Sequence, residues 1–590
     1  MKLTGAEIIW ECLIREGVDV VFGYPGGAIL PTYDAMTKYP QIHHVLTRHE
    51  QGATHMADGY ARASGKVGVA IATSGPGATN MVTGIATAIM DSSPIVCITG
   101  QVGSKALGTD AFQETDVTGV TLPITKHNYL VTRAGDIARV LREAFYIAKS
   151  GRPGPVLVDI TKDAQQSSAE FDWDGVAPSL PGYRPNLRAL PSEYERALQL
   201  LNSAKRPVIL AGQGILKASA TAQVLEFATA AGVPIAVTLL GIGAIPASSP
   251  LNLGMMGMHG EAWVNQAIQQ ADLLIALGMR FDDRVTGNLK TYAPNAKKIH
   301  VEIDPSEVNK NVHVDVALIG DLLEIITELR PRVETNARAE WWAKIAEMKG
   351  DSAVLDIQAL PDNGHLYAAH VINDIWRATK DRETIVVTDV GQHQMWEAQY
   401  YRHEAPRSLI TSGGLGTMGF ALPAAIGAKF ACPEKDVWVV VGDGGFQMTM
   451  PELATIAQEK IKINVAIINN AFLGMVRQWQ EFFYDKRYAA TPLLGPDFVK
   501  LADAFGLKGV RVTQRSEVTP AVLDGLAHEG TVVFDFRVEQ EDSVFPMVPA
   551  GAALDKMIRR PKRDVLAETG SDKEWQMPTA KAPAATTENS

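Results

Sequence analysis

The chain has 590 residues, a formal net charge of −11 at pH 7, 46% apolar residues and 21% charged residues. A chain of this length is too long for one hydrophobic core, so we expect several globular domains. The acidic balance and the lack of a long Lys/Arg run exclude a protein that binds nucleic acid by neutralising phosphates, and small-molecule partners are expected.

The N-terminal segment predicts a helix that leads to a strand, because charged residues interrupt its apolar pattern and a signal peptide lacks such interruptions. No apolar stretch approaches the roughly 20 residues that a membrane span requires. Cys12, Cys97 and Cys432 are widely separated and form no CxxC pair, which is typical of core thiols in a reducing compartment. We therefore predict a cytoplasmic protein with no membrane partner.

Three regions repeat one plan, in which β-branched runs ending in Gly or Pro turns alternate with helix-like stretches. In chain order these runs, each including its turn, are 18–27, 68–80, 92–100 and 153–160, then 206–215, 233–245, 271–283 and 297–304, then 383–392, 436–445, 463–472 and 531–538. Strands that alternate with helices form parallel sheets covered on both faces. The fold class expected is α/β, with three doubly wound parallel-sheet domains.

Stretches rich in proline and polar residues separate these regions, at about 165–190 and 331–365. We predict domains at 1–168, 190–330 and 365–550. The remaining tail, 551–590, opens with a possible short helix, AALDKMIRR. It then becomes rich in Ala, Pro and Thr, so its end is predicted to be disordered.

The third region places an acid between glycines after one strand, in GDGG, and two asparagines at the end of the next strand. A right-handed βαβ unit brings Asp443 and Asn470 to the carboxyl ends of neighbouring strands, where α/β sheets bind ligands. One carboxylate and one amide oxygen suit Mg²⁺ together with a phosphate group. We predict that GDGG itself forms a tight turn. The alternative to a metal site is that Asp443 is an ordinary residue of that turn and Asn470 a cap.

The spacing of GDG, 24 residues and then NN resembles the signature of thiamine-diphosphate enzymes. The resemblance implies that Asp443, Asn470 and the backbone carbonyl of Phe472 hold Mg²⁺. It also implies that the three domains are pyrimidine-binding, central and diphosphate-binding, in that order.

Two other motifs are weaker. GLGTMG, 414–419, satisfies the GxGxxG pattern of a dinucleotide-binding fold, but an NAD-dehydrogenase leaves GDG and NN unexplained. A zinc site is suggested by four nearby histidines, His43, His44, His49 and His55. However, His49 and His55 fall on different faces of the expected helix. We predict no metal there.

Thiamine chemistry needs a buried carboxyl group that hydrogen-bonds the pyrimidine ring of the cofactor. The segment VLTRHEQGATHMADGYARASG, 45–65, is similar to the family's pyrimidine-domain motif, and the resemblance implies that Glu50 is this acid. A capping or surface Glu is the alternative from local sequence alone. Because Glu50 and Asp443 belong to different domains, the resemblance also implies a homodimer or homotetramer with active sites between subunits.

Three stretches, GMMGMHG (254–260), GMRFDDRVTG (278–287) and GMVRQWQEFFY (474–484), resemble the catalytic subunits of acetohydroxyacid synthases (acetolactate synthases). Such enzymes decarboxylate pyruvate on thiamine diphosphate. They transfer the hydroxyethyl unit to pyruvate or 2-ketobutyrate, which gives 2-acetolactate or 2-aceto-2-hydroxybutyrate for valine, leucine and isoleucine biosynthesis. The resemblance implies FAD in the central domain, although the reaction has no net redox change, and a separate small regulatory subunit.

The same resemblance assigns residues to the cofactors and to the substrate entrance. Contacts to thiamine diphosphate fall to Gln392, His393, Gly416, Met418, Gly444, Gly445 and Met475. Met418 is the wedge between the two rings of the cofactor. The residues that it assigns to the flavin are Arg152, Gly212, Gly214, Thr238, Leu239, His259, Arg280, Asp283, Glu302, Ile303 and Asp321. The alternative for Glu302 and Asp321 is that each is an ordinary acid at the end of a strand.

At the entrance the resemblance places Gly27, Gln113 and Lys162. It implies that Trp479 favours the larger second substrate, 2-ketobutyrate. A guanidinium grips a carboxylate through two hydrogen bonds, so Arg284 is the candidate that binds the second ketoacid.

Two features depart from the family pattern, namely EAWVN after GMHG and the long polar tail. Alternative functions are another thiamine-diphosphate enzyme, such as pyruvate oxidase or sulfoacetaldehyde acetyltransferase, or a non-catalytic cofactor-binding paralogue. Trp479 and RFDDRVTG argue against the first group. The presence of Glu50, Asp443 and Asn470 argues against the second.

Overall fold

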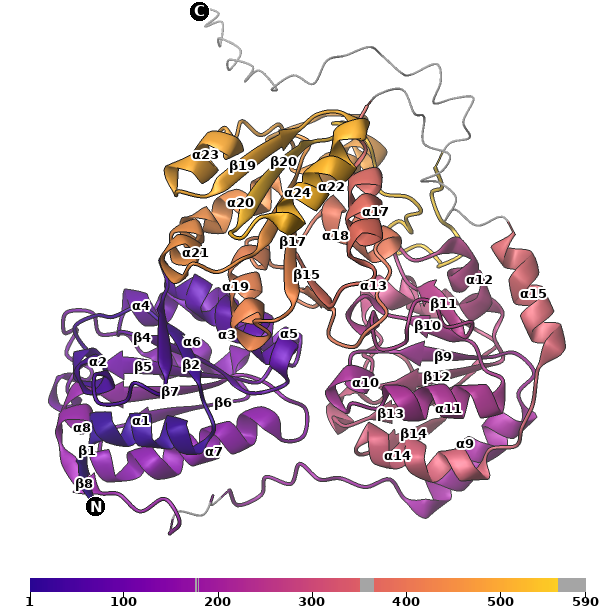
Figure 1. The fold of residues 1–590 in the computed structure, drawn as a ribbon. Coiled ribbons are helices and arrows are strands. Elements are labelled where there is room, and N and C mark those ends of the chain that lie inside the picture. The colour runs from indigo at the N-terminus through magenta and orange to yellow at the C-terminus, as the bar shows by residue number, and fades with distance from the viewer. Residues whose placement is uncertain (176–177, 179, 351–364, 561–590) are drawn as a thin grey trace, which may run out of the picture.

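The computed structural model describes residues 1–175, 178, 180–350 and 365–560. Its described residues form three six-stranded parallel sheets, one in each third of the chain, together with a small antiparallel pair (Figure 1). Helices cover the faces of each sheet, which confirms the predicted α/β class with three doubly wound sheets.

The N-terminal sheet has the strand order β3-β2-β4-β5-β7-β6. Its strands are β2 (Val20–Gly23), β3 (His43–Leu46), β4 (Gly68–Ala72), β5 (Ile95–Gln101), β6 (His127–Val131) and β7 (Val156–Thr161). β1 (Lys2–Thr4) pairs antiparallel with β8 (Ser168–Glu170). The helices are α1 (Gly5–Arg15), α2 (Leu30–Met36), α3 (Glu50–Ser64), α4 (Pro76–Asn80), α5 (Val82–Met90), α6 (Val117–Thr121), α7 (Ile137–Lys149) and α8 (Lys162–Gln166).

The central sheet has the order β11-β10-β9-β12-β13-β14. Its strands are β9 (Pro207–Ala211), β10 (Ile235–Val237), β11 (Asn252–Met255), β12 (Leu273–Leu277), β13 (Lys297–Glu302) and β14 (Val316–Ile319). The helices are α9 (Pro191–Ser203), α10 (Gly214–Lys217), α11 (Thr221–Ala231), α12 (Ala262–Gln270), α13 (Asp283–Thr286), α14 (Leu322–Leu329) and α15 (Ala339–Lys349).

The C-terminal sheet has the order β16-β15-β17-β18-β20-β19. Its strands are β15 (Thr384–Thr388), β16 (Leu409–Thr411), β17 (Asp436–Gly442), β18 (Asn464–Asn469), β19 (Lys508–Val512) and β20 (Val532–Arg537). The helices are α17 (Ala368–Thr379), α18 (Gln392–Tyr400), α19 (Ala421–Ala431), α20 (Asp443–Thr449), α21 (Leu453–Glu459), α22 (Gly474–Phe483), α23 (Phe498–Ala504) and α24 (Val518–Ala527).

Close packing of α3 against α19 joins the N-terminal and C-terminal regions (Figure 1). A Cβ on Gly59 would lie 2.0 Å from the carbonyl oxygen of Ala424, and one on Gly427 would lie 1.9 Å from that of Met56. Real Cβ atoms do not approach oxygen so closely, so both helices need glycine at this crossing. The residues around it form one continuous apolar core shared by the two regions.

Three local predictions have outcomes in the described residues. GDGG is not a tight turn, because α20 begins directly at Asp443. AALDKMIRR is not a helix, because Ile558 instead exchanges backbone hydrogen bonds with Met547. The expected second linker contains α15, which buries Trp341 and Ile345 against the central region. The end of the tail lies outside the described residues.

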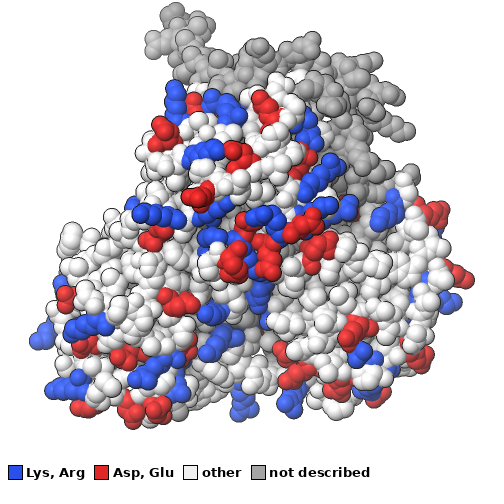
Figure 2. Space-filling view, viewed as in Figure 1, with Lys and Arg blue, Asp and Glu red and all other residues white. Residues whose placement is uncertain are grey.

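The three cysteines are unpaired and buried, as predicted for core thiols. None of the helices in the described ranges has the length and apolarity that crossing a bilayer demands. On the face shown in Figure 2, acidic and basic side chains are interspersed over all three regions.

Candidate cofactor and active site

The carboxyl edge of the C-terminal sheet gathers the residues predicted to hold the metal and the diphosphate. β17 and β18 are neighbouring parallel strands in which Gly442 pairs with Ile468. Asp443 therefore follows one strand directly, and Asn470 lies two residues beyond the pairing partner on the next. The two side chains that are 27 positions apart in the sequence end at one edge of the sheet.

Asp443 is 2% exposed, and among the described residues no basic side chain forms an ion pair with it. Burial raises the pKa of its carboxyl group to about 7. A buried carboxylate without a cationic partner is costly, and a bound divalent cation would favour its ionised form. The oxygen donors at this edge therefore fit Mg²⁺.

Gln392, the first residue of α18, orients the neighbouring amide of Asn470. The Asn470 Nδ2 donates to Gln392 Oε1 over 3.1 Å, and its Oδ1 accepts the N–H of Phe472, also over 3.1 Å. The Gln392 Nε2 in turn donates to Gln478 and to the carbonyl of Asp542. This chain of hydrogen bonds fixes the rotation of the Asn470 side-chain amide, and therefore the direction in which Oδ1 points.

His393 packs against the end of β17, since a Cβ on Gly442 would lie 3.0 Å from the imidazole ring. The ring is buried, its Nε2 has no hydrogen-bond partner within the described part of the chain, and burial lowers its pKa to about 3. A neutral imidazole with an unpartnered nitrogen is suited to bond an incoming ligand. Gly444 and Gly445 follow at the start of α20. Because they have no side chains, the space beside the first turn of this helix stays open.

Met418 reaches over this glycine pair. Its Cε lies 3.6 Å from the Cβ position of Gly444, and Leu473 Cδ2 lies 2.8 Å from the same point. Gly416, on the same loop, has φ +71°. Met475 is half-buried on the first turn of α22. The structure thus brings the predicted thiamine-diphosphate residues of this region into one group.

Glu50 lies in the N-terminal region, as the first residue of α3, and is 9% exposed. Its Oε2 accepts a hydrogen bond from Asn80 Nδ2 over 2.9 Å, and its Oε1 lies 3.3 Å from the Cβ position of Gly77. The backbone of Gln113, with φ +61°, packs on Gly75 of the same loop. Glu50 and the Gln113 segment therefore flank one glycine-rich loop.

Among the described residues, no hydrogen bond or ion pair joins Glu50 to the Asp443 group. The nearby contact between the two regions is made by Glu452, whose carboxylate accepts the N–H groups of Arg48 and His49. A single chain therefore holds the two predicted halves of the thiamine site without directly bonding one to the other.

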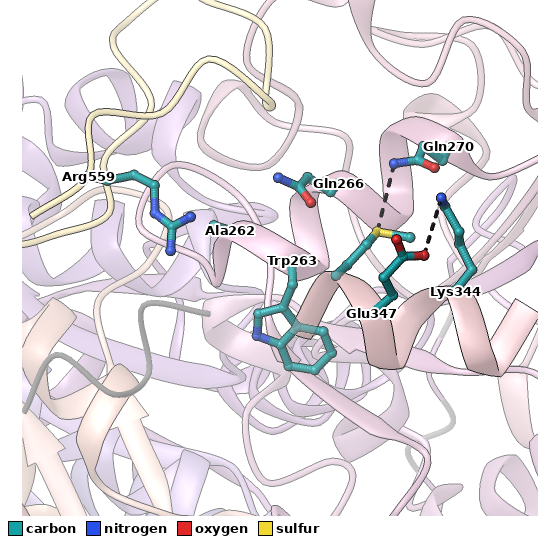
Figure 3. Close-up of a pocket in the computed structure, with 8 residues that line it drawn as sticks. Ala262, Trp263, Gln266, Gln270, Lys344, Glu347 and Arg559 are labelled. Atoms are coloured by element: carbon teal, nitrogen blue, oxygen red, sulfur yellow. Dashed lines mark hydrogen bonds and ion pairs between the residues drawn. The ribbon is translucent and has the colours of Figure 1, made fainter. Parts of the chain in front are cut away.

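The other two entrance residues also belong to the N-terminal region. Gly27 follows β2, and apart from its chain neighbours none of the described residues has an atom within 4 Å of its Cβ position. Lys162 begins α8 and lines a cavity of about 470 Å³ between α1, α2 and α8. A second cavity of about 310 Å³ lies between α12 and α15 beside Arg559, and none of the predicted site residues lines it (Figure 3).

The predicted flavin residues follow the carboxyl ends of the central strands. Gly212 and Gly214 come after β9 and press on Gly278 after β12, where a Cβ on Gly212 would meet the Gly278 carbonyl at 2.2 Å. The others at this edge are Thr238 and Leu239 after β10, Arg280 after β12, Glu302 and Ile303 at the end of β13, and Asp321 after β14. This close backbone approach and row of polar strand ends fit a dinucleotide.

Several of these side chains already have protein partners. Glu302 Oε1 accepts the N–H of Ile303, and Asp321 caps α14 through the N–H of Glu324. Arg152 bridges from the N-terminal region to Asp304 at 3.1 Å and Glu307 at 2.7 Å. His259 is buried, with its pKa lowered to about 4, and Asp283 is exposed.

Arg284 and Trp479 meet across the boundary between the central and C-terminal regions. The guanidinium carbon of Arg284 lies 5.9 Å from the centroid of the Trp479 ring, and Nη1 lies 3.3 Å from Met258 Sδ. Trp479 is 37% exposed, so both groups are accessible to a ligand. The pair predicted for the second substrate is therefore assembled from two regions.

Sequence reasoning missed three polar residues in contact with these groups, namely Asn80, Asp91 and Asp389. Asp389 follows β15 as Asp443 follows β17, so the rule that found Asp443 also applied to it. Asn80 and Asp91 lie at helix ends and gave no local signal.

Comparison with known proteins identifies the same three regions. Family models match residues 3–120 (thiamine pyrophosphate enzyme, N-terminal TPP binding domain), 194–329 (central domain) and 389–536 (C-terminal TPP binding domain). The chain is 49% identical over 569 residues to the acetolactate synthase large subunit of Mycobacterium tuberculosis, covering 94% of this chain and 91% of that protein. It is 47% identical to the acetolactate synthase large subunit of Corynebacterium glutamicum, with 94% and 89% covered. It is 44% identical to a probable acetolactate synthase large subunit of Methanococcus aeolicus, with 94% and 95% covered.

Proposed function

The chain belongs to the acetolactate synthase family of thiamine pyrophosphate enzymes, and we propose that it is the catalytic subunit of such a synthase. Pyruvate loses CO₂, and the remaining two-carbon unit is transferred to a second 2-ketoacid, either pyruvate or 2-ketobutyrate. The single observation that carries this proposal is the gathering of Asp443, Asn470, His393 and Met418 at one sheet edge. We also propose that the domains extend over 1–168, 190–330 and 365–550.

When bound, thiamine diphosphate supplies the carbon nucleophile and the electron sink for decarboxylation. The carboxylate of Asp443, the amide oxygen of Asn470 and the carbonyl of Phe472 hold Mg²⁺. The hydrogen bond from Asn470 to Gln392 supports this role, because it keeps the amide oxygen in one orientation. His393, Gly444 and Gly445 contact the diphosphate.

Gly416, Met418 and Met475 line the space above these groups, and Met418 separates the two rings of the cofactor. The distance of 3.6 Å between Met418 Cε and the position that a Cβ on residue 444 would occupy supports this role. A bulky apolar side chain at this place also excludes water from the reacting atoms.

Glu50 would hydrogen-bond the pyrimidine ring of the cofactor and hold a proton at that ring. Its burial at the start of α3 and its hydrogen bond from Asn80 support a fixed carboxyl group. Glu50 and Asp443 belong to different domains, and by the family resemblance each active site forms between the N-terminal region of one chain and the C-terminal region of a partner chain. The enzyme is then a homodimer or homotetramer.

Arg284 binds the carboxylate of the second ketoacid, and the Trp479 ring beside it favours the longer side chain of 2-ketobutyrate. The cation–π contact between them supports a shared site. Gly27, Gln113 and Lys162 line the entrance.

FAD binds along the carboxyl edge of the central sheet. The residues that hold it are Arg152, Gly212, Gly214, Thr238, Leu239, His259, Arg280, Asp283, Glu302, Ile303 and Asp321. The large-subunit names of the relatives support a separate small regulatory subunit. The unpaired cysteines support a cytoplasmic location.

The test is acetolactate formation from pyruvate by the purified protein, with thiamine diphosphate, Mg²⁺ and FAD each omitted in turn. Glu50→Gln is compared with Glu11→Gln, a surface ion-pair residue of α1. We expect no product without thiamine diphosphate or Mg²⁺, a rate loss of about 10²–10⁴-fold in Glu50→Gln, and little change in Glu11→Gln. Release of CO₂ or acetaldehyde without acetolactate would refute the proposal.

A further inference from the structure

The loop that carries Gly416 and Met418 runs from residue 412 to residue 420, between β16 and α19, and is called the Met418 loop below. A buried carboxylate holds each end of it. At its start, Asp91 Oδ2 accepts the N–H of Gly413 over 3.1 Å and Oδ1 accepts that of Gly414 over 2.7 Å. Asp91 is 1% exposed and belongs to the N-terminal region, more than 300 residues away in sequence.

At the end of the Met418 loop, Asp389 provides the matching acceptor. Its Oδ2 accepts the N–H of Gly419 over 3.0 Å and its Oδ1 accepts that of Phe420 over 3.2 Å. Asp389 is fully buried, and its own N–H donates to the carbonyl of Val440 on β17 over 3.0 Å. The carboxylate is therefore tied to the same strand that ends at Asp443.

Both acids are themselves fixed in place. Arg62 donates to Asp91 Oδ2 over 2.9 Å and to the carbonyl of Thr411, at the end of β16, over 2.7 Å. On the other side, a Cβ on residue 445 would lie 2.0 Å from Asp389 Oδ2, so glycine there leaves just enough room for the carboxylate. Asp389 thus fills the space between the Met418 loop and the glycine pair of α20.

We propose that Asp91 and Asp389 are positioning residues that set the height of Met418 above Gly444. The inference rests on the proposed function, in which Met418 separates the rings of the cofactor. Four backbone N–H groups of this nine-residue loop donate to two buried side chains that are themselves held in place, so these hydrogen bonds define the path of the loop at both ends. A displacement of about 1 Å in a group that orients the reacting atoms costs about 100-fold in rate.

The test uses Asp389→Asn and Asp91→Asn, because asparagine keeps the shape but retains one acceptor oxygen for two N–H donors. The matched control is Asp374→Asn, another buried acid of the C-terminal region, which lies on α17, pairs with Arg515 and has no described hydrogen bond with the loop. Three quantities are measured in each variant. These are the affinity for thiamine diphosphate with Mg²⁺, the C2 hydrogen–deuterium exchange rate of the bound cofactor, and the amide exchange of residues 412–420 in the cofactor-free protein.

We expect C2 exchange per bound cofactor to fall by about 10–100-fold in both loop variants, while the affinity changes by less than about 3-fold. Amide exchange of the loop should rise in the same two variants, and Asp374→Asn should alter none of the three quantities. A parallel loss of affinity and exchange rate, or an unchanged exchange rate, would overturn the proposal. If one loop variant does not fold, the other tests the same claim from the opposite end of the loop.

A double-mutant cycle with Met418→Ala then asks whether the acids act through Met418. In the Met418→Ala background, Asp389→Asn should reduce C2 exchange by less than about 3-fold, since the group it positions is gone. Full additivity would overturn the inference. Failure of the wild-type protein to bind thiamine diphosphate would instead refute the proposed function, and the amide-exchange result in the cofactor-free protein would still report on the loop.

Discussion

Active sites shared between chains make a quantitative prediction for mixed oligomers. Glu50→Gln and Asp443→Ala each remove one half of the proposed site, so either variant alone should lose at least about 100-fold in rate. In a chain that carries one of the two changes, the other half is intact. In the proposed arrangement the two halves of a site come from different chains, so an intact site requires the normal Glu50 of one chain and the normal Asp443 of its partner.

Co-expression of the two variants in equal amounts gives random assembly. Half of the chains supply a normal Glu50, and half of their partners supply a normal Asp443, so about a quarter of the sites are intact for any symmetric dimer or tetramer. The assay is acetolactate formation per milligram, with each variant co-expressed with itself as the control. Recovery to about 25% of the wild-type rate supports shared sites. Activity no higher than that of the single variants would show that each site lies within one chain and refute the reasoning.

Four further outcomes follow from the structure. Asp443→Asn should weaken Mg²⁺-dependent binding of thiamine diphosphate by about 10–100-fold, measured by titration of the apo-protein, and unchanged binding would contradict the metal assignment. Trp479→Leu should lower the preference for 2-ketobutyrate over pyruvate by about 5-fold or more in a competition assay, since loss of an aromatic contact costs about 1 kcal/mol; an unchanged ratio would remove Trp479 from the site. Gly427→Ala should lower the free energy of unfolding by about 1–3 kcal/mol in denaturant titrations, whereas Gly103→Ala, whose Cβ position meets nothing closer than 3.9 Å, should have little effect; equal effects would argue against the tight crossing of α3 and α19. Burial lowers the pKa of His55 to about 4, so between pH 6.5 and 4 the unfolded chain binds a proton that the folded protein excludes; stability should fall as pH falls through this window, less steeply in His55→Gln, and identical pH profiles would contradict this account.

The inner strands were predictable from the sequence, and the outer strands largely were not. In each sheet the four predicted strands are the inner four, and the outer pairs are β3 and β6, β11 and β14, and β16 and β19. Inner strands such as β4 and β18 are buried along their whole length and read as continuous apolar runs. Outer strands such as β6 and β19 bury few residues, so their sequences carry only a weak strand signal.

The residues of the candidate site were also predictable from the sequence only in part. Asp443 and Asn470 were found because a βαβ unit is a local structure, whose handedness brings two strand ends together without information from the rest of the chain. The sequence by itself also determined the three parallel sheets and the family. Only the tertiary structure decided that Asp91 and Asp389 hold the Met418 loop, that Arg284 faces Trp479, and that Glu50 bonds Asn80. These contacts join segments from different regions or use backbone N–H donors that every residue possesses. No residue pattern in the sequence predicts these contacts, because they form only when the complete chain has packed.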